Sequence, residues 1–129
     1  MYERSVEIAE ELVEVEGSIQ SKHNLMVSYE RLGDICARQG GEKTLERAYE
    51  VYEKNVEIAT KLAETEQTIA AYDDLAAGLF RMALHPFTTE RIRKQYLVDV
   101  KAITEILDEK TRNKRYQNLA IKSLLYSKI

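Results

Sequence analysis

The 129-residue sequence contains little that would interrupt a helix or cross-link the chain: one proline, five glycines, one cysteine and no tryptophan. A single cysteine cannot form a disulfide within the chain, which excludes a disulfide-stabilised scaffold. No apolar run is long enough to cross a bilayer, and no segment resembles a secretory signal. We therefore expect a cytoplasmic protein that makes no contact with a membrane.

The residues that are abundant favour a helical domain. Apolar residues make up 44% of the sequence and charged residues 32%, which is ordinary for a soluble globular protein. Alanine, leucine, glutamate and lysine are frequent, and they favour helix over strand. A chain of 129 residues corresponds to one domain. We expect a single all-α domain over residues 1–129.

The charges are distributed unevenly along the chain. Residues 1–90 carry 9 basic and 18 acidic side chains, a net charge of −9, whereas residues 91–129 carry 10 and 4, a net charge of +6. One interpretation is that these side chains lie on solvated outer faces of helices. The other is that the two ends attract each other between molecules, or that the basic end binds an acidic partner.

The sequence repeats itself. Residues 2–9 (YERSVEIA) return as residues 52–59 (YEKNVEIA), a spacing of 50, and the register continues without a gap through Leu25 and Leu75. A more divergent third copy follows at a spacing of 44, which relates Tyr52 to Tyr96. Apolar positions persist between the copies while charged positions change, so the repeated element is a packing unit. Three units are predicted, at about 1–41, 42–86 and 87–129.

Apolar residues within each copy recur every three or four positions, as on one face of a helix. The predicted ends come from capping chemistry: Ser18 begins a helix, Gly40 ends one, and Pro86 stops another at the preceding residue. Thr88 is predicted to cap the helix after Pro86. Six helices follow, in antiparallel pairs because the connections are short. Their predicted ranges are 2–16, 18–39, 43–65, 67–84, 89–110 and 112–127.

The segment 28–40 (SYERLGDICARQG) has an aromatic at Tyr29, then Leu32-Gly33, then glycine at Gly40. This pattern resembles the first helix of a tetratricopeptide repeat, and Ala48 with Tyr52 resembles the second. The chain is similar to the long-helix form met in bacterial members of the family. The resemblance implies a right-handed solenoid fragment of helix hairpins, in which Gly33 lets the next helix approach closely.

The chain departs from the family pattern in several respects. Its repeats are 44 to 50 residues long, where the family has 34, and the Leu-Gly pair becomes Met82-Ala83 in the second copy. The chain also begins on a helix of the second type without a first-type helix before it. We therefore expect it to be part of a longer repeat protein.

In the family, the first helices of successive repeats line a groove that binds a peptide or a partner helix. The resemblance assigns nine residues to this groove: Val27, Glu30, Asp34, Arg38, Ala77, Phe80, Leu84, Ile121 and Leu124. Acidic residues at one end and apolar residues beyond them imply a protein or peptide partner that is basic and partly apolar. The alternative, that Phe80, Leu84 and Leu124 simply pack between helices, stays open.

No group of residues points to catalysis. His23 and His85 have no zinc-binding spacing, and Cys36 has no cysteine partner and no histidine near it on its helix. The adjacent pair Asp73-Asp74 diverges on a helix and would not act as an acid–base pair. No phosphate-binding loop is present. We expect no enzyme, no catalytic residue, no metal and no cofactor.

A basic segment, residues 91–115, contains Tyr96 and is followed directly by Tyr116, and it could bind nucleic acid. Because the domain as a whole is acidic and the tyrosines fall on core positions of the repeat, we expect no nucleic-acid partner. The leading hypothesis is a protein- or peptide-binding scaffold module without catalytic activity. The alternatives are a structural or oligomerisation segment, with self-association, and a regulatory domain that senses a peptide.

Overall fold

The structure is a computed structural model that describes residues 2–111. Every regular element among these residues is an α-helix, which confirms the predicted all-α class. The helices are α1 (Tyr2–Glu16), α2 (Ile19–Gln39), α3 (Glu42–Glu66), α4 (Ile69–Leu84) and α5 (Glu90–Thr111). Their ends lie within about two residues of the predicted ones. The predicted sixth helix, 112–127, lies outside the described residues.

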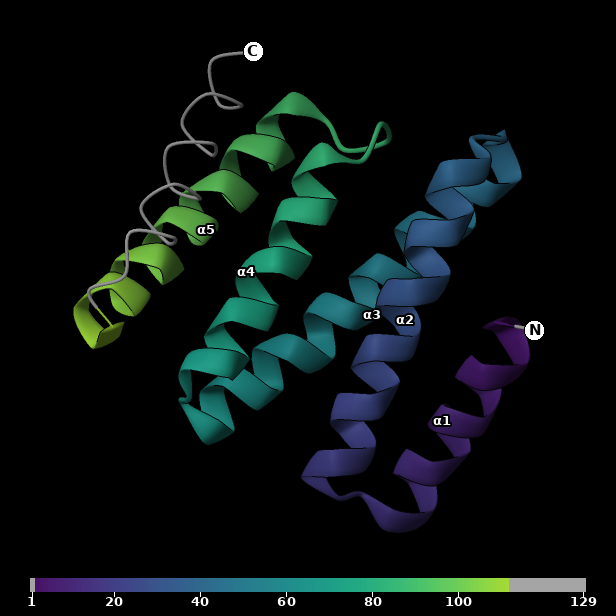
Figure 1. Ribbon diagram of the computed structural model, residues 1–129. Helices are drawn as coiled ribbons and strands as arrows, with labels where there is room; N and C mark the ends of the chain where they lie inside the picture. Colours follow the sequence, from purple (N-terminus) through teal and green to yellow (C-terminus); the bar gives the residue numbers. More distant parts are fainter. Residues whose placement is uncertain (1, 112–129) are drawn as a thin grey trace.

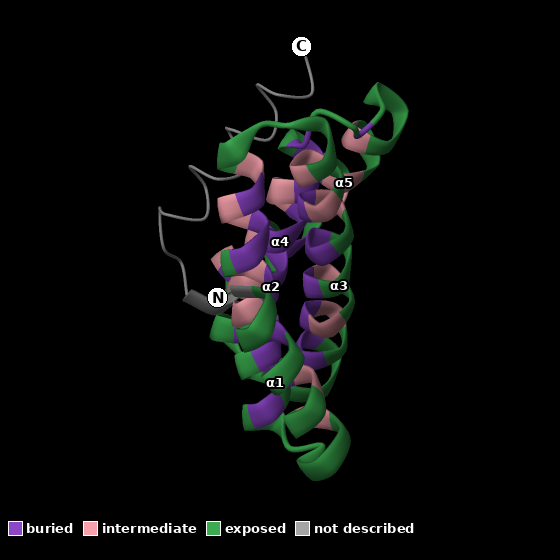
Figure 2. Cartoon of the chain, turned by 90° about the vertical axis from the view of Figure 1, so that its right-hand side faces the viewer, coloured by how far each residue is buried: buried purple, intermediate pink, exposed green. Residues whose placement is uncertain are grey.

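Each helix packs against the next one along the chain, from α1 on α2 to α4 on α5. The chain reverses direction at each short connection, so neighbouring helices run antiparallel (Figure 1). In the side view of Figure 2, α2 and α4 lie in one layer and α3 and α5 in another, with buried residues where the two layers meet. The apolar faces predicted from the sequence therefore face one another.

The core consists of two clusters of buried side chains. One joins α2, α3, α4 and α5 and includes Met26, Leu62 and Val100. The other joins α1, α2, α3 and α4 and includes Val6 and Tyr52. Half-buried side chains of α3 and α5 pack against both clusters, so the apolar core is continuous from α1 to α5.

The α1–α2 and α3–α4 turns have the same geometry, 50 residues apart. Gly17 and Gln67 both have a positive φ, of 60° and 53°. Ser18 and Thr68 follow as N-caps, and each side-chain oxygen accepts the backbone N–H three residues later, at 3.1 and 3.2 Å. These bonds satisfy N–H groups that have no partner within a helix. The predicted Ser18 cap is confirmed, and Gly40 (φ 73°) ends α2 as predicted.

The N-cap of α5 differs from the predicted one by one residue. α5 begins at Glu90, and Thr89 Oγ1 accepts the N–H of Ile92 at 3.4 Å. Thr88, which we predicted as the cap, is buried and donates its hydroxyl to the carbonyl of Met82 near the end of α4. Both threonines satisfy a helix end, and only the folded turn decides which end each one reaches.

Gly33 lets α2 and α3 approach closely, as the sequence predicted. A Cβ atom at Gly33 would lie 2.6 Å from Cδ1 of the Tyr52 ring, too close for any side chain. Gly78 has a similar role between α4 and α3, since its Cβ would lie 2.7 Å from Oδ1 of Asn55. Asn55 is itself buried and donates from Nδ2 to the carbonyl of Met26 at 2.8 Å. Two glycines and one buried amide therefore set the spacing of α2, α3 and α4.

His85 closes the loop between α4 and α5. It is 3% exposed, its Nε2–H donates to the carbonyl of Leu45 at 2.8 Å, and its Nδ1 accepts the N–H of Phe87 at 3.0 Å. The rings of Tyr49 and Phe87 pack edge-on against it, with centroids 5.1 and 5.0 Å away. Burial lowers the pKa of His85, although the bond to Leu45 opposes this effect. Both bonds require the neutral ring, because a proton on Nδ1 would face the N–H of Phe87.

We predict that Gly33→Ala destabilises the fold. Overpacking costs about 1–3 kcal/mol, and the better helix propensity of alanine recovers about 1 kcal/mol. The free energy of unfolding in urea, followed by circular dichroism, should therefore fall by up to about 2 kcal/mol. The same substitution in a Tyr52→Leu background is the control, because the ring that blocks the methyl group is then absent. An equal loss in both backgrounds would show that the Tyr52 ring does not constrain position 33.

We predict that stability falls as the pH drops below the ordinary imidazole pKa of about 6.5. Unfolded His85 binds a proton in this range, while the folded residue, with its lowered pKa, does not. The unfolded state therefore binds more protons, and the free energy of unfolding decreases with decreasing pH. Urea titrations from about pH 7.5 to pH 5.5 measure this slope. His85→Gln should flatten it, and a slope unchanged by His85→Gln contradicts the assignment.

Candidate functional site

A cluster of polar side chains lies between α2 and α4. Arg81 of α4 donates from Nη2 to Oε1 of Glu30 at 2.8 Å, and its Nε lies 3.4 Å from Oδ1 of Asp34. The hydroxyl of Tyr52, from α3, donates to the same Asp34 oxygen at 2.6 Å. Glu30 and Asp34 are four residues apart on one face of α2, so a single arginine can reach both. We call Glu30, Asp34, Tyr52 and Arg81 the polar cluster.

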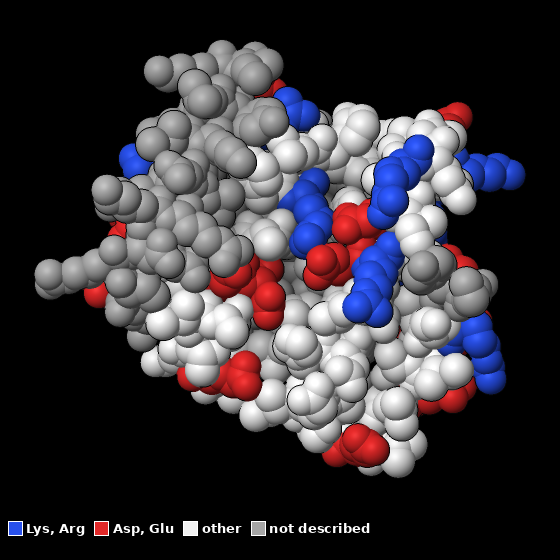
Figure 3. Space-filling view, viewed as in Figure 1, with Lys and Arg blue, Asp and Glu red and all other residues white. Residues whose placement is uncertain are grey.

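Within the polar cluster, the surroundings of the Tyr52 hydroxyl shift its pKa. Burial, and then the hydrogen bond to Asp34, raise the pKa of the Tyr52 hydroxyl, so that it remains a donor. Arg81 balances only one of the two carboxylates, which leaves a net charge of −1 between α2 and α4. Figure 3 shows acidic and basic side chains side by side near the middle of this face, where Figure 1 places α2 and α4.

A second polar pair lies nearer the turns. His23 Nε2 of α2 is 3.8 Å from Oδ2 of Asp74 of α4, and both side chains are partly exposed. Burial raises the pKa of Asp74, and His23 partly opposes this shift. The pair borders a pocket of about 170 Å³ between α2, α3 and α4. The pocket is lined by His23, Met26, Ala59, Leu62, Glu66, Thr68, Ala70, Ala71 and Asp74.

The size of this pocket limits what it can bind. Pockets for small molecules and cofactors usually measure about 300–1,000 Å³. At about 170 Å³, this one has room for a single side chain. In the part of the chain that the structure describes, no group of three or more histidine, cysteine, aspartate or glutamate residues is placed to hold a metal ion.

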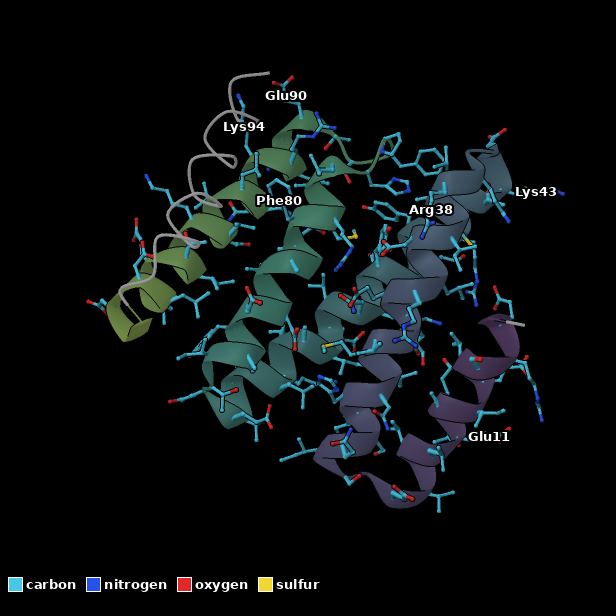
Figure 4. All side chains as sticks on the ribbon, in the orientation of Figure 1. Glu11, Arg38, Lys43, Phe80, Glu90 and Lys94 are labelled. Carbon is cyan, nitrogen blue, oxygen red and sulfur yellow. The ribbon has the colours of Figure 1, made fainter. Side chains whose placement is uncertain are left out.

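The four groove residues predicted on α2 lie along one stripe of that helix. Glu30 and Asp34 belong to the polar cluster. Val27 is half-buried and packs against the core cluster that joins α2 to α5. Arg38 is exposed near the C-terminal end of α2 (Figure 4). The ion pairs of Glu30 and Asp34 cross the space between α2 and α4, so the predicted groove is bridged at its middle.

The groove residues predicted on α4 differ from one another in how far they are buried. Ala77 is half-buried, and Leu84 is 42% exposed. Phe80, labelled in Figure 4, is half-buried and packs against the core cluster that joins α2, α3, α4 and α5. This contact favours the packing interpretation for Phe80. Ile121 and Leu124 lie outside the described residues.

Sequence reasoning missed Arg81 as a site residue. The spacing of 50 related it only to Arg31, and the two arginines differ in the structure: Arg31 is exposed, whereas Arg81 is half-buried in the polar cluster. A signal was present, because Arg81 lies four residues after Ala77 and three before Leu84, and so on the same stripe of α4. We call the surface made of this stripe and the α2 stripe the α2–α4 face; its residues are Val27, Glu30, Asp34, Arg38, Ala77, Arg81 and Leu84.

Two further candidates have structural roles. Cys36 is buried, and burial raises the pKa of its thiol, which makes it unreactive. Arg93, in the basic segment 91–115, donates from Nε to the carbonyl of Ala83 at 2.7 Å and from Nη2 to the carbonyl of Thr88 at 3.3 Å. Its guanidinium therefore ties α5 to the C-terminal end of α4.

Comparisons of the chain with protein-family models, with curated proteins and with solved structures found no match. Among the described residues, none of the helices combines the length and the apolar character needed to span a membrane.

We predict that the Arg81–Glu30 ion pair contributes about 0.5–1 kcal/mol to stability, because both side chains are partly exposed and solvent screens them. A double-mutant cycle of Arg81→Gln and Glu30→Gln, measured by urea unfolding, gives this coupling energy. The pair Lys61–Glu57 on α3 is the control: its side chains are 71% and 67% exposed, and its coupling should be near zero. Equal coupling in the two pairs would contradict a specific role for the polar cluster.

Proposed function

We propose that this chain is a protein- or peptide-binding module without catalytic activity, in which tetratricopeptide-like helix pairs stack as a right-handed solenoid. The observation that carries the proposal is the contact of Arg81 with Glu30 and Asp34. It places one stripe of α2 opposite one stripe of α4. A surface shared by alternate helices is what a repeat array offers to a ligand.

The equivalence of α2 and α4 supports this proposal. The two helices begin at turns of the same geometry and bury equivalent residues, such as Leu25 and Leu75. In both helices these leucines belong to core clusters that include α3, although Arg31 is exposed and its equivalent Arg81 is half-buried. We infer that the α2–α4 face is a binding surface, and that Val27, Glu30, Asp34, Arg38, Ala77 and Leu84 line it.

The ligand we propose is an extended segment with basic and apolar side chains. Because Arg81 already neutralises one carboxylate of the polar cluster, the remaining attraction for a cation comes from its one excess negative charge and from Asp74. Asp74 and Glu66 border a pocket whose walls include Met26 and Leu62. A lysine or arginine side chain fits such a site, since its methylene groups contact apolar walls while its charge stays near carboxylates.

The arrangement of the polar groups supports binding rather than turnover. The carboxylate of Asp34 is engaged by both Tyr52 and Arg81, and that of Glu30 by Arg81. Groups held by one another in this way position side chains but are not poised to abstract a proton from a substrate. Cys36, the single cysteine, is buried away from this face.

We predict that peptides selected from a random twelve-residue phage library on the immobilised chain are enriched in lysine or arginine next to leucine or phenylalanine. Their affinities, measured by fluorescence anisotropy, should fall at least about tenfold for Asp74→Asn combined with Leu84→Ser, a loss of about 1.4 kcal/mol. Both substitutions are mild for the fold, because Leu84 is 42% exposed and burial already disfavours the charge of Asp74.

The matched control is Val98→Ser combined with Lys101→Ser on α5, which changes one apolar and one charged exposed residue outside the α2–α4 face. This variant should bind the selected peptides as tightly as the unchanged chain. Selected peptides that bind both variants equally well, or that are rich in acidic residues, would show that the α2–α4 face is not the binding surface.

A further inference from the structure

One apolar stripe of the protein is exposed to solvent. Ile8, Leu12 and Val15 follow each other at spacings of four and three along α1, and they are 44%, 43% and 84% exposed. The spacing of 50 relates Ile8 to Ile58 and Leu12 to Leu62 on α3. There the environment differs, because Ile58 is half-buried and Leu62 is 5% exposed. We call Ile8, Leu12 and Val15 the α1 stripe.

Among the described residues, α1 and α3 differ in the helices that pack on them. α3 packs between α2 and α4, and Leu62 shares a core cluster with Met26 of α2. α1 corresponds to α3 in sequence, and α2 corresponds to α4. α2 packs on α1 as α4 packs on α3. Within the described residues, nothing packs on α1 in the way that α2 packs on α3. At Ile8 and Leu12, the α1 stripe is therefore the face that a helix of the α2 type would cover, whereas Thr65, which corresponds to Val15, is exposed on α3.

The sequence contains one more segment of that type. Residues 112–129 match α4 at a spacing of 44, as Tyr116 with Tyr72 and Leu119 with Leu75 show. α4 in turn matches α2 at a spacing of 50. Through α4, Leu119, Ala120 and Tyr126 correspond to the buried Leu25, Met26 and Leu32 of α2, while Ser123 corresponds to Tyr29, so part of the apolar pattern of α2 returns in this segment.

The charges of the two segments are complementary. α1 carries six glutamates and one arginine, a net charge of −5, and residues 112–129 carry five basic and no acidic side chains, a net charge of +5. Glu11 and Glu14 flank the α1 stripe and are exposed, and in the described part of the chain they form no ion pair. Figure 4 shows Glu11 on α1, at the outer edge of the molecule. Opposite charges around an apolar contact favour one partner and one orientation.

We propose that the α1 stripe binds residues 112–129 of a second copy of this chain. The two surfaces are different, so the contact is heterologous: copies join head to tail, and more than two can join. This inference is independent of the peptide-binding proposal, because the α1 stripe lies outside the α2–α4 face.

The first test is the mass of the 129-residue chain in solution, measured by light scattering at concentrations up to about 1 mM, where even weak association is populated. We expect the apparent mass to rise above 14.9 kDa with concentration and to fall again in about 1 M salt, which screens the charges. A mass of 14.9 kDa at every concentration in low salt overturns the proposal.

The second test uses two blocked variants. Leu12→Ser with Val15→Ser removes the α1 stripe, and Lys114→Glu with Arg115→Glu reverses charge in the terminal segment. Each variant alone should remain monomeric, while an equal mixture should form a complex of two chains and no larger species, because one intact surface of each kind remains. Circular dichroism verifies that both variants are folded. A mixture that stays monomeric overturns the head-to-tail contact.

Two controls separate this contact from other surfaces. Val98→Ser changes a valine that is 61% exposed on α5 and should leave the association unchanged. Asp74→Asn with Leu84→Ser alters the α2–α4 face and should also leave it unchanged. If this second variant abolishes the association while the α1 variant does not, the basic segment binds the α2–α4 face instead and the proposal is wrong.

Discussion

The close approach of α2 to α3 at Gly33 is the constraint on which the remaining structure depends. The absent side chain lets the Tyr52 ring lie against the backbone of α2, and this position brings the Tyr52 hydroxyl to Asp34. Asp34 is then held where Arg81 of α4 can reach it. The centroid of the Tyr52 ring lies 6.4 Å from that of His85, which closes the α4–α5 loop, and the two rings are close to perpendicular. One packing contact thus aligns three helices, a polar cluster and a loop.

The polar cluster stabilises the fold and also reduces the negative charge of the surface around it. Two carboxylates without a partner would attract a basic ligand strongly and would repel each other. With Arg81 between them, Glu30 and Asp34 hold α2 and α4 together and lose much of that attraction. On the proposed binding surface, selectivity for a cation would then depend on Asp74, beside the pocket between α2 and α4. A surface whose charges are largely balanced internally favours ligands with apolar groups as well.

Local chemistry made most of the fold predictable. The caps at Ser18 and Gly40 and the stop before Pro86 require only neighbouring residues, and they place the helix ends within about two residues. The link between Arg81 and Glu30 could not be predicted, because the two residues are 51 positions apart. It depends on how α2 and α4 rotate about their axes, which only the packed core determines. The cap of α5 could not be predicted either, because only the folded turn decides that Thr89, and not Thr88, reaches the start of this helix.

The repeat itself has a consequence for assembly. Each internal helix of a repeat array is covered on two sides, whereas Ile8 and Leu12 of α1 are exposed among the residues that the structure describes. α1 is acidic and residues 112–129 are basic, so the proposed contact between copies would gain electrostatic attraction in addition to apolar burial. Like-charged ends would repel each other and keep copies apart. Because the α1 stripe lies outside the α2–α4 face, the proposed contact between copies would leave the α2–α4 face of the copy that supplies α1 accessible.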